Sequence, residues 1–481
     1  METVMHLKEL YLQLKMPYPE LNSIRSLWNQ LSKDWKGSFK GNLLTMLTGT
    51  AISILISFFF TPVISRLYTP DMYGEFSFFR AVSTNLSLLV PLGFVNALIL
   101  PKEKDIFNAL LKIIIILALS FLVLSYSYLG IGYLLNFTDS FQARMGYWIY
   151  FLPLFVVVSV FSQVIQSWNA RLKRFRRRSV ASVAGILAGK SFTISKGLIA
   201  SSTAGLIIGE TIFLLADIII GLPKTFREFI SSLKKYSMED LKDVFRSFSN
   251  YPKYVLPASY INLFGTQLPI FLVAFTQSSS TLGQLTFALG IINIPVQLIS
   301  RSFAPVFLQK LVESTDKDDS YIARLTSRFF KSIFFLGLLP FTLLLFFGDF
   351  ILVTFLGDQW YIAGSVAQIL VYAFFLAVCT GPLSVIYRVK KRERVYFWLS
   401  TCSVVLCAAG YAIGIYIQDF WGSIIGMSAG MVLSNMIQLY YFLKMSGIKN
   451  VAGSLLLPLS ILALLFVITL WLNLFPELYV I

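Results

Sequence analysis

Ionisable side chains that interrupt long apolar stretches are the residues of this sequence most able to do chemistry. Arg80, Lys190, Glu210, Asp217 and Arg301 are each flanked on both sides by mostly apolar residues. If these stretches span a membrane, each charge costs about 2.5–3.5 kcal/mol to insert, and such residues commonly mark the path of a charged ligand. Arginine binds phosphate oxygens in pairs through its planar guanidinium, so the cations would suit a phosphate-bearing ligand.

Two of these charges are expected at similar depth on neighbouring helices. Lys190 lies about eight residues from one end of the span 179–198, roughly 12 Å deep at 1.5 Å per residue. Glu210 lies seven residues from the same side of the span 203–222, roughly 10 Å deep. They could form an ion pair that only neutralises two buried charges, or a switch that opens when an anionic cargo or a coupling cation competes. Asp217 follows Glu210 by seven residues on the same helix face.

The elements that carry these residues are membrane-spanning helices. Hydrophobic residues make up 56% of the 481-residue chain, charged residues make up 13%, and the mean hydropathy is +0.73. A soluble protein of this composition would expose far more apolar surface than water tolerates. Since a span needs roughly 20 mostly apolar residues, the sequence predicts an all-α polytopic membrane protein of about 12–14 helices. We place thirteen spans at residues 42–64, 76–100, 109–135, 147–168, 179–198, 203–222, 251–276, 284–310, 329–356, 361–386, 396–417, 420–443 and 452–475.

The net charge of +16 is explained by loops on one side of the membrane. The gaps after the fourth and tenth spans are rich in Arg and Lys, at residues 171–178 and 388–394. Cytoplasmic loops accumulate such residues, so the pattern predicts a cytoplasmic N-terminus and argues against nucleic acid as a partner. Residues 1–41 contain no continuous apolar stretch, so we expect no cleavable secretory signal. Their helical apolar stripes predict amphipathic helices on the membrane surface.

The predicted spans divide into two halves of six, with one span left over. The expected units are a cytoplasmic N-terminal segment, an N-lobe, a cytoplasmic connector of mixed charge, a C-lobe and an additional C-terminal helix, at residues 1–41, 42–222, 223–250, 251–445 and 446–481. A weak internal repeat supports the division, because Pro62 and Gly74 in the first half match Pro269 and Gly283 in the second. Duplicated halves of this kind are typical of transporters.

The sequence offers no arrangement typical of an enzyme or a metal site. The single histidine, His6, lies outside every predicted span, and no Walker A motif is present. The three cysteines lie in apolar stretches, as buried small hydrophobic residues do, and they form no metal-binding pair. We therefore expect a protein that is not an enzyme and that needs no cofactor apart from a coupling H⁺ or Na⁺.

Short motifs at the start of each half resemble those of a known transporter family. The first half contains Thr61-Pro62, Ser65-Arg66-Leu67-Tyr68-Thr69-Pro70, Tyr73-Gly74-Glu75-Phe76 and Leu100-Pro101-Lys102. The second half contains Tyr251-Pro252-Lys253-Tyr254, Gln267-Leu268-Pro269, Leu282-Gly283 and Ile294-Pro295. Over about residues 42–445, their order and placement are similar to those of bacterial polysaccharide flippases. These are the O-antigen or oligosaccharide translocases of the multidrug/oligosaccharidyl-lipid/polysaccharide exporter superfamily.

This resemblance implies two six-helix lobes around a central cavity that is lined chiefly by the first two helices of each lobe, with alternating access. It implies as cargo an undecaprenyl-pyrophosphate-linked oligosaccharide, moved from the cytoplasmic to the outer leaflet of the bacterial inner membrane for O-antigen, capsule or exopolysaccharide biosynthesis. Membrane lipids, a polysaccharide polymerase and a chain-length regulator are the further candidate partners.

The candidate site residues follow from the charges and from the helices that the resemblance places around the cavity. Cations and amides of these helices, together with the deep cation Lys190 of the span 179–198, are the substrate-binding candidates: Arg80, Arg301, Lys190, Lys253, Gln267 and Asn293. The candidates for a coupling or cavity ion pair are Glu210, Lys190 and Asp217. Aromatic residues near span ends are expected to be interfacial anchors: Tyr147, Trp148, Trp360 and Tyr361.

Two alternatives from the same superfamily stay open on the sequence alone. A peptidoglycan lipid II flippase would use the same pyrophosphate carrier, although the motifs from Arg66 to Phe76 fit the oligosaccharide branch better. A cation-coupled multidrug exporter would need a carboxylate in the first two spans for its coupling ion, and those spans contain none. Arg80 would also oppose a cationic drug.

Overall fold

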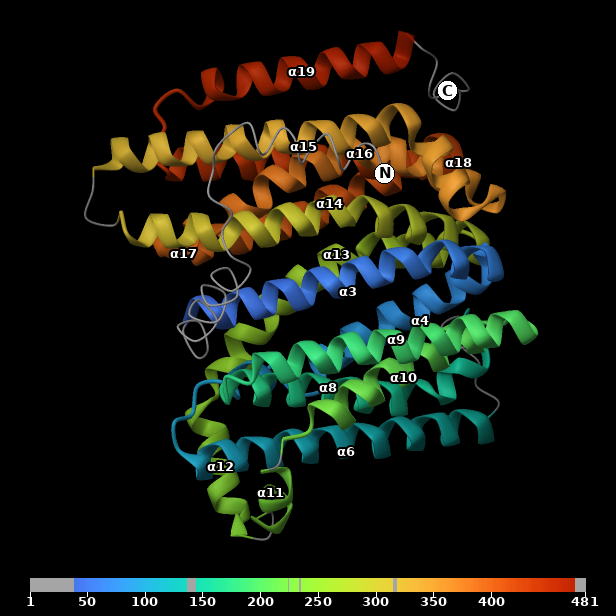
Figure 1. Cartoon of the computed structure of the whole chain (residues 1–481), viewed down its shortest axis with the longest axis vertical. Helices are drawn as coiled ribbons and strands as arrows, with labels where there is room; N and C mark the ends of the chain where they lie inside the picture. The colour runs from blue at the N-terminus through green and yellow to red at the C-terminus, as the bar shows by residue number, and fades with distance from the viewer. Residues whose placement is uncertain (1–38, 136–143, 224, 233–234, 315–317, 472–481) are drawn as a thin grey trace, which may run out of the picture.

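The described part of the chain is entirely helical. The computed structural model describes residues 39–135, 144–223, 225–232, 235–314 and 318–471, and no strand is present in these ranges (Figure 1). The prediction of an all-α protein is therefore confirmed. The amphipathic helices expected within residues 1–41 fall almost wholly outside the described residues.

Ten of the described helices are long and apolar enough to cross a membrane. They are α6 (Lys104–Leu134), α8 (Leu152–Arg171), α9 (Phe175–Ala200), α10 (Thr203–Gly221), α13 (Leu256–Thr276), α14 (Ser279–Val312), α15 (Asp319–Leu356), α16 (Tyr361–Leu383), α18 (Glu393–Met445) and α19 (Val451–Trp471). Two further long helices, α3 (Phe39–Leu67) and α4 (Pro70–Leu89), pack in the same bundle (Figure 1). The short helices are α5 (Phe94–Ala97), η1 (Gly146–Tyr150), α11 (Phe226–Ser232), α12 (Met238–Ser247), η3 (Tyr251–Val255), η4 (Asp358–Trp360) and α17 (Ile386–Val389).

The longest element, α18, consists of two helical arms that turn back on each other. The helical geometry breaks at Gln418 and Asp419, and Asp419 has a φ of 41°. Across this turn the arms touch, because a Cβ on Gly414 would lie 1.9 Å from the carbonyl oxygen of Gly422. Small residues allow helix backbones to approach this closely. With α3, α4 and both arms of α18 counted, the described residues form thirteen long helices, the number that the sequence predicts.

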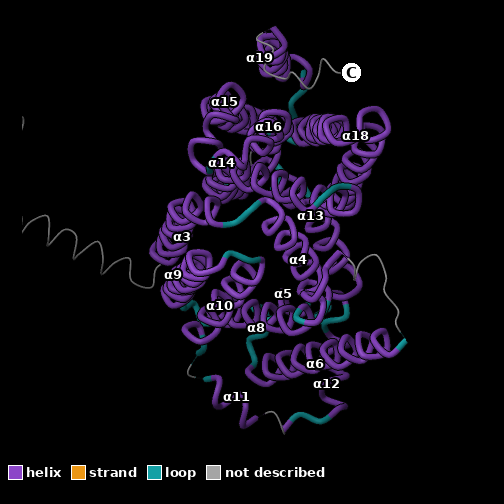
Figure 2. Tube along the Cα trace, turned by 90° about the vertical axis from the view of Figure 1, so that its right-hand side faces the viewer, coloured by secondary structure: helices purple, strands orange, loops and turns teal. Residues whose placement is uncertain are grey.

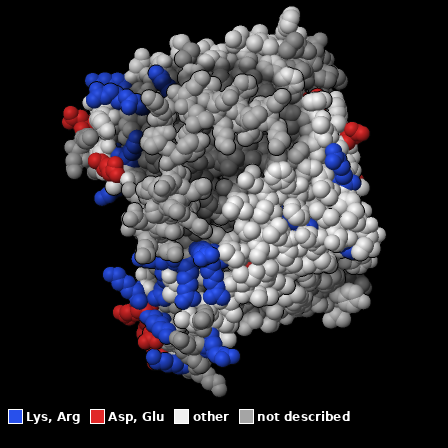
Figure 3. Space-filling view, in the orientation of Figure 1, with Lys and Arg blue, Asp and Glu red and all other residues white. Residues whose placement is uncertain are grey.

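The two ends of the bundle differ in charge. Lys and Arg side chains gather along one edge of the molecule (Figure 3), where α12, α17 and the first turns of α15 lie (Figure 1). We call this the basic end. At the opposite end the chain passes from α3 to α4 between Leu67 and Pro70, and from α13 to α14 between Thr276 and Ser279. We call it the closed end, because two groups of helices meet there.

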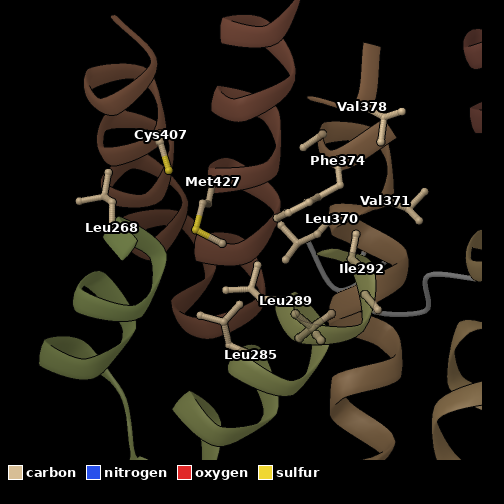
Figure 4. Close-up of a cluster of buried hydrophobic side chains, with 14 of the residues drawn as sticks. Leu268, Leu285, Leu289, Ile292, Leu370, Val371, Phe374, Val378, Cys407 and Met427 are labelled. Atoms are coloured by element: carbon tan, nitrogen blue, oxygen red, sulfur yellow. The ribbon is translucent and has the colours of Figure 1, made fainter. Parts of the chain in front are cut away.

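The helices pack as two groups, α3–α10 and α13–α18. α4 is the main helix of the first group that contacts the second, through α13 and α14, and Figure 2 places α4 and α13 near the centre of the bundle. In the second group, α16 is enclosed by α14, α15 and α18, and most of its side chains are buried. Figure 4 shows the apolar core formed there by α13, α14, α16 and α18, with side chains that include Leu268, Leu285, Leu289, Ile292, Leu370, Val371, Phe374, Val378, Cys407 and Met427.

The segment between the two groups folds against the basic end of the first group. The ring of Phe229 in α11 packs on Trp168 of α8, with the ring centroids 5.8 Å apart. The hydroxyl of Tyr236 donates a hydrogen bond of 2.9 Å to Asp105 at the start of α6. The connector is therefore held by both aromatic and polar contacts to α6 and α8.

The backbones of the two groups touch where α4 crosses α14 at the closed end. A Cβ on Gly74 would lie 1.8 Å from the carbonyl oxygen of Ser279, and a Cβ on Gly283 would lie 1.9 Å from that of Pro70. Pro70 and Ser279 are the first residues of α4 and α14, and each precedes its glycine by four residues. The contact is thus nearly two-fold symmetric, and it uses the two glycines that the internal repeat pairs.

Replacing Gly74 by Ala should keep the closed end from closing. Cβ atoms essentially never come within 3.0 Å of a heavy atom to which they are not bonded. A Cβ on residue 74 would lie 1.8 Å from the carbonyl oxygen of Ser279, so the backbone at Ser279 must move away. Spin labels at Tyr147→Cys and Tyr361→Cys, exposed positions on the two groups, should then report a longer distance between the groups than in the parent protein. The distance between the two labels is measured by double electron–electron resonance spectroscopy on purified protein whose native cysteines are replaced.

Gly290→Ala is the matched control for this substitution. Gly290 lies on α14, the helix that α4 crosses, but a Cβ there meets no atom within 4 Å, so the distance between the groups should not change. The same distance distribution in Gly74→Ala and in the parent protein would show that the glycine crossing does not hold this end closed.

Candidate functional site

Three charged residues from three helices form a cluster inside the first group. The Nη2 atom of Arg80 on α4 lies 3.7 Å from Oε1 of Glu210 on α10. Lys190 on α9 interacts electrostatically with both of them. Among the described residues, Glu210 forms an ion pair within 4 Å with Arg80. The expected ion pair of Glu210 with Lys190 is not formed at this distance. The cluster holds two cations and one anion.

Arg80 is exposed although it lies deep in the bundle. It is ten residues from the start of α4, roughly 15 Å from the closed end at 1.5 Å per residue, and 59% of its side chain is exposed. A charged side chain at this depth must face protein or water rather than lipid. Glu210 and Lys190, the charged neighbours of Arg80, belong to the first group, and α4 is also the helix that contacts α13 and α14 of the second group.

Aromatic rings close the bundle between Arg80 and the closed end. Tyr73 of α4 packs against Phe287 of α14, and Phe287 packs against Trp360, with ring centroids 4.3 and 4.0 Å apart. Trp360 is fully buried, and its indole N–H donates a hydrogen bond of 2.9 Å to the carbonyl oxygen of Ser65. The prediction that Trp360 is an interfacial anchor is therefore wrong, whereas Tyr147 and Tyr361 are exposed, as such anchors are.

Hydrogen bonds join the two groups at the same end. The hydroxyl of Ser65 donates to the carbonyl oxygen of Leu356 at 2.9 Å, and the guanidinium of Arg66 donates to that of Thr354 at 3.1 Å. From the other edge of the first group, Arg144 donates to the carbonyl oxygen of Gln277 at 2.7 Å. We call these bonds and the Trp360–Ser65 bond the closed-end latch. Sequence reasoning identified Ser65 and Arg66 as members of a motif and gave Arg144 no partner, although Arg66 and Arg144 are the only two basic residues in the gaps after odd-numbered spans.

Asp217 lies apart from the Arg80 cluster. It is buried, and its Oδ2 accepts hydrogen bonds of 2.7 Å from Ser162 and 3.0 Å from Gln166, both on α8. The guanidinium of Arg178 on α9 donates a hydrogen bond of 3.5 Å to the Oε1 atom of Gln166. The carboxylate of Asp217 thus accepts hydrogen bonds from neutral donors. The cation of Arg178 contacts Gln166, which lies between it and the carboxylate.

The other sequence-predicted candidates lie outside both arrangements. Lys253 is exposed in η3 at the basic end, and Gln267 is half-buried on α13, two residues before Pro269. Asn293 on α14 donates to the carbonyl oxygen of Leu289 in its own helix. Arg301 lies on the same helix, 22 residues from its start, roughly 33 Å from the closed end. The structure therefore brings together Arg80, Lys190 and Glu210, and leaves these four separate from them.

The side-chain amides of Asn85 on α4 and Asn262 on α13 donate hydrogen bonds to the backbone of their own helices. The acceptors are the carbonyl oxygens of Ala81 and Ala258, four residues earlier in each helix. The Oδ1 atom of Asn262 also accepts a bond from Tyr396, whereas the buried Oδ1 of Asn85 has no partner. Within the described ranges, no group of three or more His, Cys, Asp or Glu could hold a metal ion.

Removing the carboxylate of Glu210 should destabilise the protein more than removing the charge of Arg80. Glu210→Gln leaves two neighbouring cations without an anion, whereas Arg80→Gln leaves Glu210 with Lys190 as partner. Uncompensated charge inside a membrane bundle is costly, so we expect Glu210→Gln to lower the Tm by about 2–4 °C, the equivalent of about 1 kcal/mol. Thermal unfolding in detergent measures both variants, and equal Tm values would contradict a cluster that depends on its one anion.

Comparison with solved structures finds the same fold in multidrug transporters. An inward-facing multidrug resistance MATE family transporter of the MOP superfamily covers 84% of this chain and 99% of its own, with a TM-score of 0.61 and 12% identity. The outward-facing form of such a transporter gives a TM-score of 0.53, 86% and 98% coverage and 13% identity. A MOP superfamily transporter from Pyrococcus furiosus gives 0.54, with 84% and 94% coverage and 14% identity. No curated protein sequence matches the chain.

The family comparison covers well over half of the chain. Residues 63–364 match the family described as "Polysaccharide biosynthesis protein". This range begins in α3 and ends in α16, so it contains both glycines of the crossing, the Arg80 cluster and the whole closed-end latch. The predicted family and the predicted transporter fold are both confirmed. The chain belongs to the polysaccharide biosynthesis protein family, and it is a multi-pass membrane protein with the fold of the MOP superfamily.

Proposed function

We propose that this protein is a flippase for a lipid-linked oligosaccharide. Its cargo is an undecaprenyl-pyrophosphate-linked repeat unit, which it takes from the cytoplasmic leaflet of a bacterial inner membrane and releases in the outer leaflet by alternating access. The cargo then serves the synthesis of O-antigen, capsule or exopolysaccharide. Membership of the polysaccharide biosynthesis protein family and the transporter fold both support this proposal.

The observation that carries the proposal is the exposed Arg80, deep in the bundle on α4, the helix that contacts the second group. A pyrophosphate head group cannot cross hydrocarbon without a substitute for its hydration, and a fixed cation in a polar space provides one. The Arg80–Glu210 contact of 3.7 Å is longer than the 2.7–2.9 Å typical of strong charge-assisted bonds. A phosphate oxygen can therefore compete with Glu210 for the guanidinium, and Lys190 then remains to balance the carboxylate.

The structure corresponds to a state that loads cargo, if the basic end faces the cytoplasm. Cytoplasmic loops of membrane proteins are rich in Lys and Arg, which supports that orientation. The closed end, where the latch lies, then faces outward. The higher TM-score to a structure described as inward-facing than to one described as outward-facing, 0.61 against 0.53, supports the same assignment.

The sign of the charge near Arg80 favours an anionic cargo over a cationic drug. With two cations and one anion, the cluster carries a net positive charge and repels a cation. The Pyrococcus furiosus structure is described as having a binding pocket of reverse polarity that suggests a different function, so pocket charge separates members of this fold. A peptidoglycan lipid II flippase would have an equally anionic head group and is an outcome of the test below.

The test of this function is export by cells that carry Arg80→Gln as their only copy of the gene. Losing a charged hydrogen bond to the cargo costs about 1.5–3 kcal/mol, so export should fall at least about tenfold. Lipid-linked oligosaccharide should accumulate on the cytoplasmic side, measured by mass spectrometry, while the amount of protein in the membrane stays normal. Arg301→Ala should act in the same direction.

Lys102→Gln is the matched control, since Lys102 is an exposed cation outside the helices and should leave export unchanged. Deletion of the gene gives the decisive comparison. Normal surface polysaccharide without any accumulated intermediate would sink the flippase hypothesis. Accumulation of lipid II would instead identify the cargo as a peptidoglycan precursor, and sensitivity to cationic drugs alone would identify an exporter.

For coupling, we propose that Asp217 takes up the proton that drives the transport cycle. Its carboxylate is buried and accepts hydrogen bonds from Ser162 and Gln166, so protonation would remove the negative charge that strengthens these bonds and would weaken the contact between α8 and α10. Asp217→Asn should transport at a rate that no longer responds to an imposed pH gradient in membrane vesicles. Asp243→Asn, an exposed carboxylate of α12, is the control, and a normal response in Asp217→Asn would assign coupling elsewhere.

A further inference from the structure

A row of cations lies on one face of α15, far along the chain from the Arg80 cluster. Arg324, Arg328 and Lys331 follow each other at intervals of four and three residues, which places them on the same side of the helix. All three are exposed. Together with the hydroxyls of Ser327 and Ser332 and the ring of Phe335, they line a groove of about 430 Å³. We call it the α15 groove.

The α15 groove lies where the helix enters the membrane from the basic end. α15 has 38 residues, which makes it roughly 57 Å long, so it extends well beyond a hydrocarbon core of about 30 Å. Arg324 and Lys331 lie five and twelve residues from its start, roughly 8 and 18 Å along the axis. The cations are therefore level with the head groups of the lipids at this end, and the apolar part of the helix begins directly after them.

The face of the helix continues as apolar surface beyond the cations. Phe335 and Leu339 follow Lys331 at intervals of four residues, and 52% and 69% of these residues are exposed. Among the described residues, none of the three cations has an ion pair with a carboxylate. The surface thus presents three cations, two hydroxyls and then apolar side chains, in the order in which a membrane lipid presents its phosphate and its chain.

We propose that the α15 groove is a docking site for the pyrophosphate head group of the polyprenyl carrier. The phosphates bind Arg324, Arg328 and Lys331, the Ser327 hydroxyl donates to a phosphate oxygen, and the chain lies along Phe335 and Leu339, while the Ser332 hydroxyl donates to the carbonyl oxygen of Arg328. The proposal rests on the proposed function, since it names a second site for the same cargo. α15 contacts α3 of the first group at its other end, where Thr354 and Leu356 accept hydrogen bonds from Arg66 and Ser65, so the groove lies at the end of α15 remote from this contact.

The number of cations favours the diphosphate carrier over an ordinary anionic phospholipid. Arg324 and Lys331 are seven residues apart, roughly 10 Å along the axis, with Arg328 between them. Guanidinium groups bind phosphate oxygens in pairs, so the row can engage two linked phosphates at once. A phospholipid with one phosphate would leave part of this charge unmatched, and it should bind more weakly.

The test is binding of sugar-free polyprenyl pyrophosphate to the full-length protein in nanodiscs of neutral lipid. We compare the parent protein with the triple variant Arg324→Gln, Arg328→Gln, Lys331→Gln. The variant should bind the carrier at least about tenfold more weakly, because it loses charged hydrogen bonds. The matched control is Lys391→Gln, Arg392→Gln, Arg394→Gln, which removes three exposed cations at the same end and should bind like the parent.

Competition with other ligands separates the sources of phosphate. An anionic glycerophospholipid or inorganic pyrophosphate should displace the carrier only at much higher concentration. Displacement by the phospholipid at equal concentration would overturn the proposal in favour of a general lipid site. Equal carrier binding by the parent and the α15 triple variant would overturn the groove but leave the proposed cargo intact. A parent protein that binds no carrier would overturn the proposed function and the groove with it.

Discussion

The structure depends on two helix backbones that touch without any side chain between them. At Gly74 and Gly283 the helices α4 and α14 approach so closely that a Cβ on either would overlap a carbonyl oxygen of the other. The partners in the closed-end latch lie on different groups, so they come within hydrogen-bonding distance only if this crossing is closed. The crossing joins equivalent positions of the two halves, as expected of a fold with duplicated halves.

The hydrogen bonds of the closed-end latch can break and re-form. Arg66, Arg144 and Trp360 all donate to backbone carbonyl oxygens, which water can also satisfy once the closed end opens. No buried charge is left without a partner when these bonds break, since neither group supplies a carboxylate to them. The free-energy cost of opening therefore comes mainly from exposing the apolar rings around Phe287 to water. This hydrophobic cost is non-directional, and separating these rings leaves the core of each group intact.

Sequence patterns predicted this fold well where the information is local. Apolar length located the thirteen helices, and the repeat pairing Gly74 with Gly283 picked out the two residues that touch. The same reasoning failed for Trp360, because an aromatic residue at the end of a span looks the same whether it faces lipid head groups or the other half of the protein. It also missed Arg144 and Gln277, whose bond joins residues 133 positions apart and leaves no periodic signal in either segment. Long-range partners of this kind are set by packing, which the apolar pattern does not specify.

Two cationic sites for one head group impose a condition on their relative strength. If the α15 groove bound the carrier much more tightly than the space around Arg80, the cargo would stop at the entrance. The groove offers three cations at head-group level, where water and salt screen them. Arg80 and Lys190 offer fewer charges, partly balanced by Glu210, but they lie deeper in the bundle, where salt screens partly buried charges less. The lower charge of the inner site is therefore compatible with comparable binding at both, and Glu210 keeps the inner site from becoming a trap that holds the cargo instead of releasing it.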